Sequence, residues 1–258
     1  MKYLRKIFTT MALMTIFSAS VFAKSGFEFH YSALLGVGVS FPTTSMKDMG
    51  FKSDIGFDGT GLFQIGYMRQ VKEGFGISYL LELGYNIGSY TISGKPDFNS
   101  IVSYALNEMF GININPNQVG MPNDMSVALD FTFYNIQIGL FPKFNFGNFS
   151  IGIGGGIKVP ISGELTTTIN VAAIDYEREN TQKLNRTDIV DIFNPPIFGY
   201  VKTSLAYSFY LTDKIALDVG LYLSYDIMQF INEGGKDEYG GTLNTGIIFG
   251  VKFGGKVD

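Results

Sequence analysis

Residues 27–41 read FEFHYSALLGVGVSF, and this stretch decides the fold class. Every second residue of it is apolar, and most of the residues between are small or polar. Such alternation predicts a β-strand with one apolar face, because successive side chains of a strand point to opposite sides of the sheet. Strands of soluble proteins average about 5–6 residues, whereas a tilted strand that crosses a membrane needs about 9–11. This run is long enough to cross.

Seven further runs repeat the pattern, which predicts eight strands in all. They cover residues 57–70, 75–92, 127–146, 149–162, 197–211, 214–230 and 240–254. In the run 127–146, Leu129, Phe131 and Phe133 have the opposite phase to the residues that follow, so we expect a bulge or the start of a strand there. Aromatic residues near the strand ends predict two girdles, formed by Phe27, Phe75, Phe146, Phe149, Phe209 and Phe253 at one level and Phe41, Phe57, Tyr90 and Phe131 at the other.

The connections alternate in length. Short turns are expected at residues 71–74, 147–148 and 212–214, and long loops at 42–56, 93–126, 163–196 and 231–239. Residues 100–110 have apolar positions at helical spacing, and the mixed charges within 163–196 indicate a solvated loop. The chain is thus predicted to be all-β, an eight-stranded antiparallel up-and-down transmembrane β-barrel with short periplasmic turns and four long outer loops.

The first 23 residues have the three parts of a secretory signal peptide. Positive charges at Lys2, Arg5 and Lys6 precede an apolar stretch, and cleavage is expected after Ala23, which leaves residues 24–258 as the barrel. Cleavage would change the net charge from −4 to −7, because it removes three basic residues and no acidic one. An acidic chain with few arginines is a poor candidate for binding nucleic acid. The absence of cysteine excludes disulfides, thiolate metal sites and a cysteine nucleophile.

In these features the chain resembles the small eight-stranded outer-membrane barrels of the OmpA/OmpX type. The last strand, NTGIIFGVKF at residues 244–253, is similar to the C-terminal insertion signal of that family, although five residues follow Phe253 here. The resemblance implies that the mature chain lies in the lipid of the bacterial outer membrane and is inserted by the barrel-assembly machinery. We expect a monomer.

The polar faces of the strands predict what fills the barrel. An eight-stranded barrel is just wide enough for side chains, and charges away from water must be paired. The candidate lumen network is Glu28, His30, Glu82, Lys143, Lys158, Lys202, Asp218, Asp226 and Lys252. One hypothesis is a salt-bridged plug. The other is a narrow water path beside the inward glycines Gly36, Gly38, Gly152, Gly154 and Gly156.

Catalysis is not expected. His30 and Ser32 share a strand face beside Glu28, but residues two apart on a strand do not touch easily, and this face points to the lumen and away from lipid substrates. No cofactor or metal motif is found. The function predicted is that of a surface-exposed structural or recognition protein, antigen or adhesin-like, acting through its outer loops and a possible extracellular partner. The alternative is a narrow passive pore for small solutes. A soluble lipocalin-like barrel is disfavoured, because it would need a charged outer face.

Overall fold

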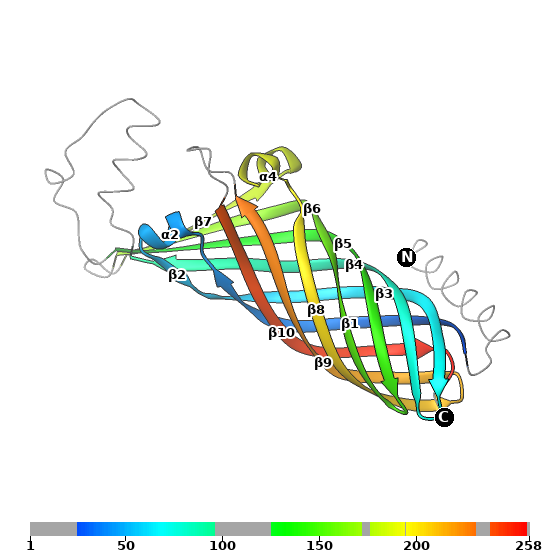
Figure 1. Ribbon diagram of the computed structural model, residues 1–258. Helices are drawn as coiled ribbons and strands as arrows, with labels where there is room; N and C mark the ends of the chain where they lie inside the picture. The colour runs from blue at the N-terminus through cyan, green and yellow to red at the C-terminus, as the bar shows by residue number, and fades with distance from the viewer. Residues whose placement is uncertain (1–24, 96–124, 172–175, 194, 231–237, 257–258) are drawn as a thin grey trace, which may run out of the picture.

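The computed structural model describes residues 25–95, 125–171, 176–193, 195–230 and 238–256. Eight long antiparallel strands form a closed ring in the order β1-β3-β4-β5-β6-β8-β9-β10, with β10 paired to β1. Their bounds are β1 Gly26–Phe41, β3 Ile55–Lys72, β4 Phe75–Gly94, β5 Met125–Phe146, β6 Phe149–Val171, β8 Phe198–Thr212, β9 Ile215–Phe230 and β10 Glu238–Phe253. The predicted eight-stranded up-and-down barrel is confirmed (Figure 1). None of the described helices is long and apolar enough to span a bilayer.

The short turns all lie at one end of the barrel. They join β3 to β4, β5 to β6 and β8 to β9, and Gly74 and Gly147 adopt positive φ angles of 71° and 59° that glycine tolerates. The start of β1 and the end of β10 lie at the same end, where Phe29 pairs with Phe253. The strand ends that lead into the long connections therefore lie at the opposite end, as expected for an outer-membrane barrel.

Three strands continue beyond the ring at the long-loop end and form a projecting sheet. The upper parts of β4, β5 and β6 (residues 89–94, 125–133 and 163–171) stay paired there, and two short strands, β2 (Phe51–Ser53) and β7 (Tyr176–Leu184), extend the sheet at its sides (Figure 1). Two short helices, α2 (Thr44–Asp48) and α4 (Arg186–Ile192), lie close to the barrel mouth.

The interpretation of residues 163–196 as a solvated loop was therefore wrong. Its first nine residues continue β6, and its mixed-charge stretch forms strand β7 and the start of α4. A strand exposed on both faces needs no apolar alternation. The signal peptide at residues 1–23 and the helix expected at 100–110 lie outside the described residues.

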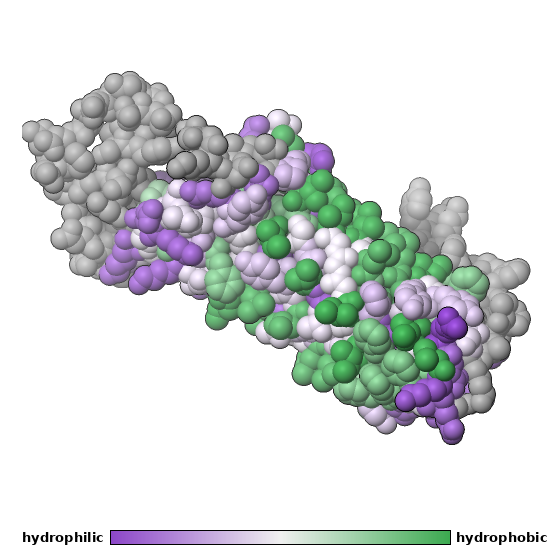
Figure 2. All heavy atoms as spheres, in the orientation of Figure 1, coloured by the Kyte–Doolittle hydropathy of each residue, from purple (hydrophilic) through white to green (hydrophobic). Residues whose placement is uncertain are grey.

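The outer wall of the barrel is an apolar belt with a sharp upper edge. Within the belt the outward side chains are exposed and apolar, for example Leu83 on β4 and Leu140 on β5. The next outward row is Ser89, Thr132 and Glu164, which are register partners, and the hydroxyls of Ser89 and Thr132 lie 3.2 Å apart. This row marks where lipid would give way to water. Figure 2 shows the apolar band on the visible face, with hydrophilic side chains toward both ends.

The inner face changes polarity in the opposite sense. Asn135 of β5 faces a polar lumen, but Phe133 and Phe131, on the same face, pack in an apolar core with Tyr90. The placement of Tyr90 and Phe131 in a lipid-facing girdle was therefore wrong, since they point inward above the belt. The bulge expected in β5 was wrong, because β5 pairs with β4 without a register shift and its change of phase follows the inverted polarity. The bulge is in β6 instead: Tyr134 pairs with Ser162 and Asn135 with Pro160, which leaves Ile161 as the extra residue.

Candidate functional site: the filled lumen

At the end of the lumen near the short turns, ion-pair distances join two carboxylates, two lysines and one histidine. His30 Nε2 lies 3.5 Å from Glu28 Oε2, and His30 Nδ1 lies 3.4 Å from Asp218 Oδ2. Lys252 Nζ lies 3.4 Å from Glu28 Oε2, and Lys143 Nζ lies 3.8 Å from Asp218 Oδ2. All five side chains are buried, and His30 lies between the two carboxylates, each of which also has a lysine beside it. We call these residues the lower layer.

Midway along the barrel, Glu82 of β4 is the centre of a second cluster. Its carboxylate accepts hydrogen bonds from Lys202 Nζ at 2.7 and 3.0 Å, from the Tyr200 hydroxyl at 2.9 Å and from Gln64 Nε2 at 2.6 Å. The ammonium of Lys202 also lies 4.7 Å from the centre of the Phe141 ring, a distance that allows a cation–π contact. Glu82 is completely buried, and residues of three strands, β3, β4 and β8, meet at its carboxylate. This is the middle layer.

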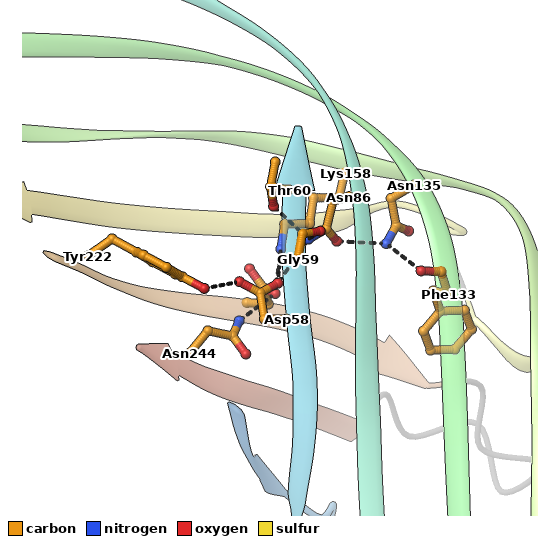
Figure 3. Close-up of polar contacts among 10 residues, drawn as sticks. Asp58, Gly59, Thr60, Asn86, Phe133, Asn135, Lys158, Tyr222 and Asn244 are labelled. Atoms are coloured by element: carbon orange, nitrogen blue, oxygen red, sulfur yellow. Dashed lines mark hydrogen bonds and ion pairs between the residues drawn. The ribbon is translucent and has the colours of Figure 1, made fainter. Parts of the chain in front are cut away.

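Nearer the mouth, a third cluster surrounds Asp58, as Figure 3 shows, together with Asp226. Asp58 accepts hydrogen bonds from the Tyr222 hydroxyl at 2.5 Å and from Asn86 Nδ2 at 2.8 Å. Lys158 Nζ donates to Asp226 Oδ2 at 2.7 Å and lies 4.0 Å from Asp58 Oδ1, so one lysine bridges the two carboxylates. This is the upper layer, and it joins residues from β3, β4, β6 and β9.

An apolar core closes the lumen above the upper layer. It is formed by the inward side chains of the projecting sheet, by the mouth ends of β8 and β9, and by residues on or beside α4 and β2. Its buried members are Phe51, Tyr90, Ile92, Val127, Phe131, Phe133, Leu184, Ile189, Phe193, Phe198, Met228 and Phe230. The Phe193 ring lies 4.7 Å from that of Phe230 and 5.1 Å from that of Phe198, centre to centre. Water entering from the mouth would have to cross this layer of packed rings.

Aromatic side chains occupy the space beside two of the inward glycines. A side chain at Gly36 would collide with the Tyr222 hydroxyl, and one at Gly152 would collide with the Phe141 ring. The room beside these two glycines is thus filled by aromatic side chains, Tyr222 of β9 and Phe141 of the neighbouring strand β5. Between the lower and middle layers remains a cavity of about 20 Å³ lined by Lys143, Lys202 and other residues, enough for about one water molecule.

The structure places all nine residues of the candidate network in the lumen. His30, Glu28, Asp218, Lys143 and Lys252 meet in the lower layer, Glu82 and Lys202 in the middle layer, and Lys158 and Asp226 in the upper layer. The three groups form separate layers of contacts along the barrel. No hydrogen bond or ion pair among the described residues joins His30 to Ser32, the pair considered for catalysis.

Sequence reasoning missed Asp58, Tyr200 and Tyr222 as members of the network. Asp58 alternates with Thr60, Leu62 and Gln64 on the inward face of β3, a phase that the sequence contains. With Asp58, the buried lumen groups number five carboxylates, four lysines and His30. The two tyrosines carry no charge, and nothing in the local sequence indicates that their hydroxyls reach carboxylates on strands across the barrel.

No protein-family model matches the chain, and no curated protein matches it. Solved structures of outer-membrane proteins do match. Neisserial surface protein A is 14% identical, with 90% of this chain and 99% of that chain covered and a TM-score of 0.32. The attachment invasion locus protein Ail of Yersinia pestis is 10% identical over 87% and 99%, with a TM-score of 0.31. The outer membrane protease OmpT of Escherichia coli is 11% identical over 92% and 99%, with a TM-score of 0.33. Values this low carry no argument about the function of the chain.

Proposed function

We propose that this protein is a closed barrel of the bacterial outer membrane, and that it acts at the cell surface as a structural or recognition protein. In this proposal the lumen network is a structural plug with no transport role. The projecting sheet and the outer loops are the parts that meet other molecules.

The filled lumen is the observation that carries the proposal. Three layers of buried polar contacts follow one another along the barrel, and the apolar core lies above them. A passive pore needs a continuous aqueous path, and wide barrels such as porins have one because they contain 16–18 strands. Here a ring of eight strands encloses large inward aromatic side chains, which favours a plug over the narrow pore.

The outer surface supports the membrane location. The ring closes on itself, so the backbone groups of the membrane-crossing segments pair within the barrel, as hydrocarbon surroundings require. An exposed apolar belt surrounds that ring, and exposed aromatic side chains lie near its turn end, including Phe27, Tyr79 and Phe209. Contiguous apolar surface of this extent is foreign to soluble monomers.

Conductance of the mature chain tests the proposal. The protein would be refolded in detergent, checked for folding by circular dichroism, and added to a planar lipid bilayer beside a porin as positive control. We expect no discrete openings from folded, inserted protein.

Steady openings would overturn the plug, and variants would then locate the path. Openings that disappear in Glu82→Phe or Lys158→Phe but persist in Glu164→Phe, which lies on the outer face of the projecting sheet, would establish conduction through the lumen.

We also propose that His30 has a structural and not a catalytic role. Its two ring nitrogens face Glu28 and Asp218, and its side chain is buried in the lower layer away from the lipid surface. A His30→Asn variant should lose stability in urea titrations. Hydrolysis of lipid esters by the wild type that His30→Asn abolishes would contradict this role.

A further inference from the structure

Strand β7 is paired along one edge only. It pairs with β6 from Gly163↔Leu184 to Val171↔Tyr176, and no strand in the described part of the chain pairs with its other edge. The side chains of residues 177–183 are exposed on both faces of this strand. An open edge presents unpaired backbone donors and acceptors to any extended chain that reaches it.

The charges on β7 show which extended chain fits that edge. Its sequence YERENTQKL contains Glu177, Arg178, Glu179 and Lys183, and none of them forms an ion pair among the described residues. The register with β6 puts Glu177, Glu179, Thr181 and Lys183 on one face, opposite Asn170, Thr168, Thr166 and Glu164. Acidic residues thus lie toward the start of one face, and the lysine lies at its end.

This pattern is self-complementary. If a second β7 pairs antiparallel with the first about Asn180, Glu177 of each copy lies directly opposite Lys183 of the other, and Glu179 lies opposite Thr181. A register centred on Thr181 places Glu179 opposite Lys183 instead, again twice. We infer that the free edge of β7 binds the β7 edge of a second copy of this chain, so that two projecting sheets become one.

The symmetry of that pairing determines where the second barrel lies. Identical antiparallel strands in one sheet are related by a two-fold axis perpendicular to the sheet. The projecting sheet continues the barrel wall (Figure 1), so this axis is nearly perpendicular to the barrel axis and reverses its direction. The two barrels would therefore lie in apposed membranes, with their long-loop ends facing. The contact would join two cells, and each barrel would remain a monomer within its own membrane.

Cysteine cross-linking tests the pairing directly, because the chain contains no cysteine. Residues directly opposite in an antiparallel pair have Cα atoms about 4.5–5.5 Å apart, within the range that a disulfide spans. In folded protein, Asn180→Cys or Thr181→Cys should therefore give a disulfide-linked dimer, depending on which of the two registers forms. Gln182→Cys is the matched control, because its two copies would be four residues out of register about Asn180 and two about Thr181. We expect cross-linking on the order of tenfold above that control.

Charge exchange gives a second, independent test in vesicles. Two populations of proteoliposomes, each with its own dye, should cluster when both contain the wild type. In the register centred on Asn180, Glu177→Lys should abolish clustering within its own population, and so should Lys183→Glu, because like charges then meet. In the register centred on Thr181, Glu179→Lys takes the place of Glu177→Lys. Mixing the Glu177→Lys vesicles with the Lys183→Glu vesicles should restore clustering, since each copy then meets its complement. Lys47→Glu, on α2, is the control for general charge effects.

The inference rests on the proposed function only in placing the long-loop end outside the cell, and the two can fail separately. Channel openings would overturn the proposed plug, and they would not bear on the pairing of the β7 edges. The edge pairing would be overturned if the dimers of Asn180→Cys and Thr181→Cys were no more abundant than those of Gln182→Cys. It would also be overturned if vesicles with either charge variant of the register identified by cross-linking clustered as the wild type does. Cross-linking to a different protein in cells, without homodimer, would also overturn it and assign the edge to another partner.

Discussion

The same three strands, β4, β5 and β6, pass through two regions whose polarity is inverted. In the belt their outward residues are apolar, as at Leu140, and their inward residues are polar, as at Gln137. In the projecting sheet the outward residues are polar, as at Thr132 and Thr166, and the inward residues form the apolar core around Phe133. The backbone pairing continues through the change with a single bulge.

The difference shows that an alternating sequence defines an apolar face and a polar face of a strand. It does not show which face points to the interior and which to lipid or water. Lipid requires apolar side chains outside and leaves polar groups to pair inside, whereas water above the membrane permits the ordinary arrangement with an apolar interior. The two regions should therefore differ in what destabilises them. Charged networks should matter most in the first region and packing in the second.

The largest effect is expected in the middle layer. Glu82→Leu removes the carboxylate that pairs with Lys202 and accepts from Tyr200 and Gln64, and leaves a buried ammonium without its partner. We expect a loss of about 3–5 kcal/mol in the free energy of unfolding. Urea titration of the protein in lipid vesicles, followed by circular dichroism, measures it.

A double variant separates the ion pair from general damage to the lumen. Glu82→Leu combined with Lys202→Met removes both charges, and most of the lost stability should return, because a buried pair replaced by apolar groups is often neutral. If the double variant is as unstable as Glu82→Leu alone, the unpaired lysine is not the cause, and the packing of the middle layer is.

The next largest effect is expected for a lysine placed on the outward face of β5, and its cost in stability should differ between the two regions. Leu140 and Ala128 both point outward from β5, the first near the middle of the belt and the second in the projecting sheet. Leu140→Lys should cost about 2–4 kcal/mol, because it places a charge in hydrocarbon, and Ala128→Lys should change stability by less than about 0.5 kcal/mol. The same urea titration in vesicles measures both. Equal costs would show that the upper edge of the belt lies elsewhere.

The barrel itself could be predicted from the sequence because its signal is local. Period-two alternation recurs in all eight runs, and turn residues such as Gly74 and Gly147 mark the hairpins. The inward charges followed from the same alternation. Asp58 belongs to the same pattern, and was missed only because its run was interpreted from its apolar face.

What could not be predicted depends on contacts between distant strands or on the level of the membrane surface. Tyr90 and Phe131 have the spacing of girdle residues, and only their height above the belt shows that they point inward. The hydroxyls of Tyr200 and Tyr222 reach carboxylates 118 and 164 residues away in the sequence. Strand β7 has no apolar face, so only its pairing with β6 identifies it as a strand.

The smallest effect tests whether the two regions unfold together. Asn185 caps α4, where its side chain accepts from the backbone N–H groups of Thr187 at 2.7 Å and Asp188 at 3.2 Å, and Asp188 accepts in return from the Asn185 N–H at 2.8 Å. Asn185→Ala should destabilise the helix by about 1 kcal/mol. Hydrogen exchange at the amides of Ile189 and Phe193, which donate within the helix, should then accelerate about fivefold.

The urea midpoint of the barrel should not move in Asn185→Ala, because the helix packs on the projecting core and lies outside the belt. Thr187→Ala, on the exposed surface of the same helix turn, is the matched control and should leave exchange at both amides nearly unchanged. If Asn185→Ala instead lowers the urea midpoint by the full cost of the cap, the projecting core and the membrane barrel form one cooperative unit. The two regions would then differ in polarity and surroundings and still unfold in a single transition.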